Sequence, residues 1–134
     1  MKTILYIILI LCTFQVYGAR LQKEEVYRAE FCNGTKQVTL RDRTRADCFK
    51  DGYAVEVDFA DKWAEAIGQS THYALVSNLK PMIALIIEKE ADCKHVAKIV
   101  ESIRHTYIYL LGEIVRIELR QTGPLRCITG TITP

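Results

Sequence analysis

The sequence of residues 47–73 is DCFKDGYAVEVDFADKWAEAIGQSTHY, and the expected arrangement of the other elements is built around it. Asp51-Gly52 is a pair of residues favoured in a two-residue β-hairpin turn. Residues 53–59 then alternate between apolar and acidic side chains, which is typical of a β-strand. From about residue 61 to residue 76 the apolar side chains recur at helical spacing. The stretch therefore predicts a hairpin followed by an amphipathic helix, with several carboxylates close together.

The remaining chain supplies the other elements of one α/β domain. We expect helices over residues 20–31 and 92–105, and strands over 36–41, 44–50, 82–87 and 113–119. The resulting order is α-β-β-β-α-β-α-β. The first three strands are expected to form an antiparallel meander. The fourth joins the sheet through a helical crossover, and the fifth extends one edge.

The first residues have the pattern of a secretory signal peptide. Lys2 supplies positive charge, residues 4–14 are almost wholly apolar, and small residues follow at Gly18 and Ala19. We expect cleavage after Gly18. The predicted organisation is a signal peptide over residues 1–18, a domain over 19–121 and a C-terminal tail over 122–134. The protein is then exported, periplasmic or secreted, without a stable membrane span after cleavage; retention of an N-terminal membrane anchor is the alternative.

The net charge excludes a general attraction to nucleic acid. The chain has 18 Lys and Arg against 16 Asp and Glu, and loss of Lys2 leaves a mature net charge of +1. Any binding of phosphate must therefore be local. Two basic groups are candidates, although each is also typical of a solvated face: Arg41, Arg43 and Arg45 in the first hairpin, and Lys94, Lys98 and Arg104 on the last helix.

Four cysteines remain after cleavage: Cys32, Cys48, Cys93 and Cys127. An even number in an exported chain predicts two disulfides, for which three pairings are possible. Cys32 with Cys48 and Cys93 with Cys127 would close the shortest loops, and the sequence leaves the choice open. No pair has the spacing of a zinc site.

The hairpin turn predicts which side chains lie opposite each other. With Asp51-Gly52 as the loop, Asp47 faces Glu56, and Arg45 faces Asp58. Opposed carboxylates repel each other, so a cation would relieve the contact between Asp47 and Glu56. Carboxylate oxygens are the ligands that Mg²⁺ and Mn²⁺ prefer. For Asp58, an ion pair with Arg45 is the other interpretation.

Asp47, Glu56 on the next strand, and Gln69-x-x-x-Tyr73 on the following helix resemble the PD-(D/E)xK nuclease superfamily. The likeness is to the branch whose helix carries Q-x-x-x-Y, and it covers residues 20–88. It implies a restriction-endonuclease-like α-β-β-β-α-β core with a central mixed sheet, to which this chain adds a C-terminal helix and strand. It also implies that Asp47 and Glu56 hold Mg or Mn and that Gln69 and Tyr73 bind substrate.

The resemblance further implies an acidic residue on the first helix, for which Glu24, Glu25 and Glu30 are candidates. It fails at the family lysine, which should lie two residues after the glutamate, where this chain has Asp58. We expect Lys62, at the start of the helix, to reach back and act as the catalytic lysine beside Asp47 and Glu56. Some relatives of the superfamily carry this lysine on the helix.

The resulting hypothesis is an exported, Mg- or Mn-dependent nuclease that hydrolyses phosphodiester bonds in DNA. The alternative is a catalytically inactive nuclease-fold protein with a binding or structural role outside the cytoplasm. A small disulfide-stapled interaction module is a third interpretation, which the strand and helix patterns favour less.

Overall fold

A four-stranded mixed sheet forms the centre of the molecule in the computed structural model, which describes residues 19–128. Its strands lie in the order β3 (Cys48–Lys50), β4 (Tyr53–Phe59), β5 (Lys80–Ile86) and β8 (Glu118–Thr122). Strand β3 is antiparallel to β4, whereas β4, β5 and β8 are parallel. Each parallel pair is joined by a helical crossover, as the chain order predicts.

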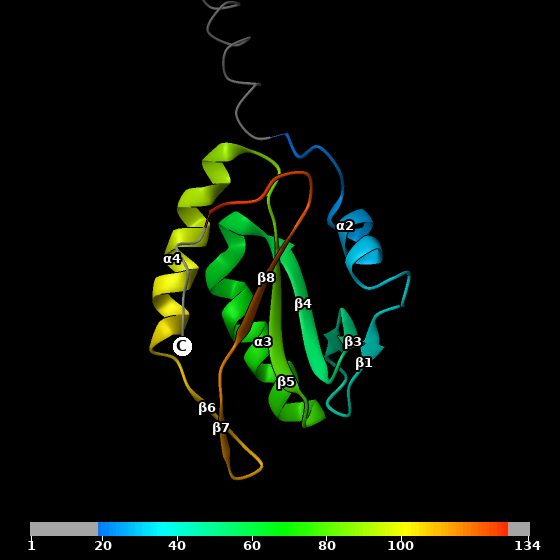
Figure 1. Ribbon diagram of the computed structural model, residues 1–134. Helices are drawn as coiled ribbons and strands as arrows, with labels where there is room; N and C mark the ends of the chain where they lie inside the picture. The colour runs from blue at the N-terminus through cyan, green and yellow to red at the C-terminus, as the bar shows by residue number, and fades with distance from the viewer. Residues whose placement is uncertain (1–18, 129–134) are drawn as a thin grey trace, which may run out of the picture.

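Three helices cover the two faces of this sheet (Figure 1). Helix α2 (Glu24–Phe31) lies on one face, where its Tyr27 packs with Val55 and Val57 of β4. Helices α3 (Trp63–Ser77) and α4 (Cys93–Arg104) lie on the other, where Ala66, Val96 and Ile99 pack with Ile83 and Leu85 of β5. Short 3₁₀ turns, η1 (Ala60–Lys62) and η2 (Glu90–Asp92), precede α3 and α4. The fold is therefore a mixed α/β domain with a sheet between helical layers.

The predicted antiparallel meander of the first three strands is wrong in detail. Strand β1 (Val38–Thr39) pairs only with β2 (Arg45–Ala46), in a separate small sheet. The predicted strand over residues 44–50 breaks at Asp47, because the carboxylate of Asp47, not its main chain, takes the N–H of Val57. The antiparallel pairing of the first strands is therefore interrupted between β2 and β3, next to the β3–β4 hairpin.

The predicted last strand over residues 113–119 is also divided. Strand β7 (Glu113–Val115) folds back on β6 (Ile108–Leu110), and only β8 continues beside β5. This β6–β7 hairpin projects from the body of the molecule (Figure 1). Leu111 and Gly112 form its turn with positive φ angles of 52° and 87°. A leucine is unusual at the first position of such a turn, so Gly112 alone marked the turn in the sequence.

The N-terminal helix begins later than predicted. The main-chain N–H groups of Leu21 and Gln22 donate to Glu88 Oε1 at 2.9 and 3.2 Å, and Tyr27 Oη donates to the same oxygen at 2.8 Å. These bonds hold residues 21–22 outside the helix, which starts at Glu24. Burial and the bond to Glu88 raise the pKa of Tyr27 to about 12. Glu88, at the end of β5, thus fixes the start of α2.

Two disulfides, Cys32–Cys48 and Cys93–Cys127, join distant parts of the chain. They are the pairs that close the shortest loops, and they are consistent with folding in an oxidising compartment. The first tail residues are held in place, since Thr122 ends β8 and Leu125 N–H donates to Ile87 O at 3.2 Å. The predicted signal peptide and residues 129–134 lie outside the described residues. Within residues 19–128, no helix has the length and apolar character to cross a membrane.

Two glycines provide a matched test of this packing. Gly123 has φ of +88°, and a Cβ there would lie 2.8 Å from Ile87 O, so Gly123→Ala should lower the free energy of unfolding by about 2 kcal/mol. Gly68 lies in α3 with open space around it, so Gly68→Ala should raise that free energy by up to about 1 kcal/mol. Denaturant unfolding of both variants measures the effects. Equal effects in the same direction would contradict this account of the β8–β5 junction.

Candidate functional site

Asp47 and Glu56 meet where the central hairpin opens. The turn at Asp51 and Gly52 has positive φ angles of 53° and 84°, as a two-residue hairpin loop requires. The predicted register is confirmed from Lys50–Tyr53 to Cys48–Val55. The ladder stops there, one position short of Asp47 and Glu56. Their carboxylates therefore lie beside an interrupted strand edge, not in a regular ladder.

The carboxylate of Asp47 is held by three neighbours. Its Oδ2 accepts the buried N–H of Val57 at 2.8 Å, and its Oδ1 accepts Gln37 Nε2 at 3.0 Å. Arg28 Nε of α2 lies 3.8 Å from the same Oδ1. Asp47 is 4% exposed. These contacts fix its orientation and partly compensate its charge.

Glu56 lies on the α3 face of β4 and is also buried. Its register partner Ile83 belongs to the core between the sheet and α3, which places Glu56 on that face. Burial, together with repulsion from Asp47, Asp58 and Glu24, raises the pKa of Glu56 from 4.5 to about 9. Glu56 therefore binds a proton at neutral pH unless a cation offsets the surrounding charge.

Asp58 pairs with Lys62, and the predicted pair with Arg45 is wrong. Lys62 Nζ lies 3.3 Å from Asp58 Oδ1 and 3.7 Å from Glu24 Oε2. Arg45 lies instead in β2, which pairs with β1. It is not part of the β3–β4 ladder, because the strand is interrupted at Asp47. Lys62 does reach back from η1, and the residue that it meets on the first helix is Glu24.

The charges of this group shift one another. Burial raises the pKa of Asp58, while the N–H of Phe59 and the ammonium of Lys62 oppose the rise. Burial and Asp58 likewise raise the pKa of Glu24. Partial burial lowers the pKa of Lys62, but Asp58 and Glu24 outweigh it, so the net shift is upward and Lys62 stays cationic. We call Glu24, Asp47, Glu56 and Asp58 the carboxylate cluster.

The two residues of the helix motif differ in their surroundings. Tyr73 is half-buried, and burial together with the charges of Glu56 and Asp47 raises its pKa to about 12. Its hydroxyl therefore keeps its proton and is available as a hydrogen-bond donor near the cluster. Gln69 Nε2 donates to Glu65 Oε1 at 3.1 Å on the exposed side of α3. Tyr73 is thus near the carboxylates, whereas Gln69 is engaged with its own helix.

Arg28 and Gln37 were missed by the sequence reasoning. Arg28 follows Glu24 by four residues, so both lie on one side of α2, and this spacing was a usable signal. Gln37 lies in the loop before β1, and no pattern around it marks a contact with Asp47.

The donor set fits a hard divalent cation in its chemistry, since it consists of carboxylate oxygens at unfavourably high density. Among residues 19–128, no three Asp, Glu, His or Cys side chains are grouped so that they could hold a metal ion by themselves. Magnesium, however, is usually bound by one or two carboxylates together with water and phosphate oxygens. Asp47 and Glu56 suit that smaller role, because relief of their repulsion would favour binding.

Comparisons with family models, with curated proteins and with solved structures found no match for this chain.

Proposed function

We propose that this protein is an exported nuclease of the PD-(D/E)xK type, dependent on Mg²⁺ or Mn²⁺, that hydrolyses phosphodiester bonds in DNA. The observation that carries the proposal is the carboxylate cluster itself. Four acidic side chains from α2, the hairpin and β4 converge with Lys62 and Tyr73, although burial and mutual repulsion raise the pKa of Glu56 to about 9. Such costly arrangements are most frequent at functional sites.

The residues have distinct roles in this proposal. Asp47 and Glu56 would hold the cation, with water and phosphate oxygens as its other ligands. A bound divalent cation acidifies water and offsets the charge that develops on a phosphoryl group. Lys62, held cationic between Asp58 and Glu24, would orient the attacking water. Tyr73 would donate a hydrogen bond to a phosphate oxygen, and Gln69 would have to leave Glu65 to bind substrate.

A catalytically inactive nuclease-fold protein, with a binding or structural role outside the cytoplasm, is the second candidate. It is favoured by the contacts of Asp47, both of whose oxygens already have protein partners. It is also favoured by Asp58 at the place of the family lysine. In that case the carboxylate cluster would organise the hairpin and α2 without binding a cation.

The test is cleavage of plasmid DNA by the purified protein with Mn²⁺, together with calorimetric titration of Mn²⁺. We expect wild-type cleavage to disappear with EDTA. In Glu56→Gln, both cleavage and Mn²⁺ binding should be lost. In Lys62→Gln, cleavage should be lost while Mn²⁺ binding persists, because Lys62 is assigned to water and not to the cation.

Glu113→Gln is the matched control, since Glu113 is an exposed carboxylate on the β6–β7 hairpin. It should leave cleavage and Mn²⁺ binding unchanged. If the wild type binds no Mn²⁺ and cleaves no DNA with Mn²⁺ or with Mg²⁺, the nuclease proposal fails. The catalytically inactive nuclease-fold alternative is then supported. Cleavage that is equal in the wild type and Glu56→Gln would show that the carboxylate cluster is not the active site.

A further inference from the structure

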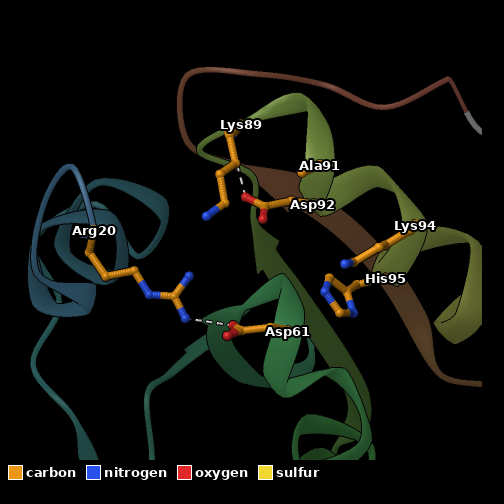
Figure 2. Close-up of a pocket in the computed structure, with 7 residues that line it drawn as sticks. All are labelled: Arg20, Asp61, Lys89, Ala91, Asp92, Lys94 and His95. Atoms are coloured by element: carbon orange, nitrogen blue, oxygen red, sulfur yellow. Dashed lines mark hydrogen bonds and ion pairs between the residues drawn. The ribbon is translucent and has the colours of Figure 1, made fainter. Parts of the chain in front are cut away.

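A cavity lined mainly by charged and polar side chains lies at the carboxyl ends of β4 and β5, with a volume of about 300 Å³. Figure 2 shows its side chains directed around a common space from the N-terminal segment, η1, η2 and α4. Outside the carboxyl ends of parallel strands is a common place for ligands in α/β proteins. We call this cavity the basic pocket. Its charged and polar lining residues are Arg20, Asp61, Lys89, Asp92, Lys94 and His95.

The charges of the basic pocket favour an anion. Arg20, Lys89 and Lys94 are cationic, and only Asp61 and Asp92 oppose them. Asp61 is compensated by Arg20, whose Nη2 lies 2.6 Å from Asp61 Oδ1. Asp92 Oδ2 accepts the N–H groups of Glu88 and Lys89 at 3.0 and 3.2 Å. With Arg20 and Asp61 paired, Lys89 and Lys94 outweigh the single carboxylate of Asp92 and leave the pocket with one net positive charge.

Arg20 is held in position before any ligand binds. Besides its ion pair with Asp61, its guanidinium carbon lies 3.8 Å from the ring centroid of Phe59. The next two residues are tied to Glu88 through their main-chain N–H groups. A guanidinium held in this way loses little conformational entropy when it binds an anion.

The beginning of α4 lies beside the pocket, where Lys94 and His95 are the second and third residues of this 12-residue helix. The N–H of Cys93, the first residue of α4, already donates to Glu90 O, so the helix contributes the positive end of its dipole here and not free donors. His95 Nδ1 is buried without a hydrogen-bond partner among the described residues. Because that atom is also shielded from solvent, it does not face the cavity, and His95 enters the argument only as a lining residue.

From this combination of cavity, cations and helix start, we propose that the basic pocket binds a phosphate group of the nucleic-acid substrate. The assignment to nucleic acid rests on the proposed function. The pocket and the carboxylate cluster share the η1 turn, in which Asp61 contacts Arg20 and the next residue, Lys62, contacts Asp58 and Glu24. A phosphate bound here positions the chain for cleavage at a neighbouring phosphodiester.

The test measures binding without cleavage, on the purified protein in EDTA. Inorganic phosphate is titrated at constant ionic strength while the ring protons of His95 are followed by NMR. We expect saturable shifts that are larger for His95 than for His72 and His105. Lys94→Gln should weaken phosphate binding about tenfold, since it removes a charge-assisted hydrogen bond. The control is Lys98→Gln, one turn further along α4 and outside the lining, which should change the affinity less than about twofold.

Single-stranded oligonucleotides with and without a 5′-phosphate then identify the source of the phosphate. Preference for the phosphorylated one assigns the pocket to a chain end, and equal competition with inorganic phosphate by both assigns it to the backbone. Absence of saturable shifts, or equal losses in Lys94→Gln and Lys98→Gln, overturns the proposal. Phosphate binding that neither oligonucleotide displaces overturns its nucleic-acid part. Because no cation is present, a failure of Mn²⁺-dependent cleavage leaves these outcomes unaffected.

Discussion

Glu56→Gln should make the folded protein more stable at neutral pH, by up to about 3 kcal/mol in EDTA. The pKa of Glu56 rises from 4.5 to about 9 on folding, so at pH 7 the folded state must bind a proton that the unfolded state has released. The cost at pH 7 is about 1.4 kcal/mol for each pH unit between 4.5 and 7, since the unfolded state releases its proton above pH 4.5. Glutamine keeps the size and hydrogen-bonding capacity of the protonated carboxyl and removes this cost. Guanidinium unfolding of both proteins at pH 5, 7 and 8 measures the difference.

The sign follows from proton binding. Between pH 4.5 and about 9 the folded state binds more protons at Glu56 than the unfolded state, so the free energy of unfolding falls as the pH rises. The wild type should therefore lose stability across this range, and Glu56→Gln should lose less. Glu113→Gln, at an exposed carboxylate, should follow the wild type. A variant that is less stable than the wild type at pH 7 would show that ionised Glu56 is stabilised by its surroundings.

A stabilising loss of an acidic side chain would also bear on function. Active sites commonly keep groups that lower stability, because the chemistry requires them. Mn²⁺ should reverse the effect in the wild type by favouring the ionised carboxylate, and it should do so more strongly at pH 8 than at pH 6. Glu56→Gln should show no such stabilisation by Mn²⁺.

The sequence predicted the central elements because their signals are local. The alternation in β4, the Asp51-Gly52 turn and the apolar run of β5 determine these strands and the crossover between them. The two broken strands could not be predicted in this way. At Asp47 a side chain replaces the main chain as acceptor, which is a tertiary contact that periodicity does not contain. At the β6–β7 turn, Leu111 has a positive φ where Asn, Asp or Gly is usual, so only Gly112 marked the turn.

The site was predictable only in part for the same reason. Strand alternation placed Glu56 and Asp58 on one face, and helical spacing brought Tyr73 near them. Glu24 could not be chosen over Glu25 and Glu30, because the choice depends on where α2 begins. The bonds from residues 21 and 22 to Glu88 set that position. The basic pocket also combines segments from residues 20 to 95. Of the basic residues predicted on the last helix, only Lys94 lines it.

Removal of each disulfide in turn should distinguish effects on the stability of the fold from effects on the candidate site. The Cys32–Cys48 bond spans 16 residues and the Cys93–Cys127 bond 34 residues. Since a cross-link restricts the unfolded chain more when its loop is longer, the double variant Cys32→Ala with Cys48→Ala should lose about 3 kcal/mol. The double variant Cys93→Ala with Cys127→Ala should lose about 4 kcal/mol. Guanidinium unfolding at one pH measures both losses.

Their effects on the candidate site should run in the opposite order. Cys48 directly follows Asp47, and Cys32 ends α2, from which Arg28 reaches Asp47. Loss of this bond should weaken Mn²⁺ binding by the folded protein. Cys127 is still held without its disulfide, because Gln121 Oε1 accepts its N–H at 2.7 Å, and this bond lies apart from the carboxylate cluster. The Cys93–Cys127 variant should therefore bind Mn²⁺ as the wild type does. Equal weakening in both variants would mean that Mn²⁺ binding follows overall stability and not the local placement of Asp47.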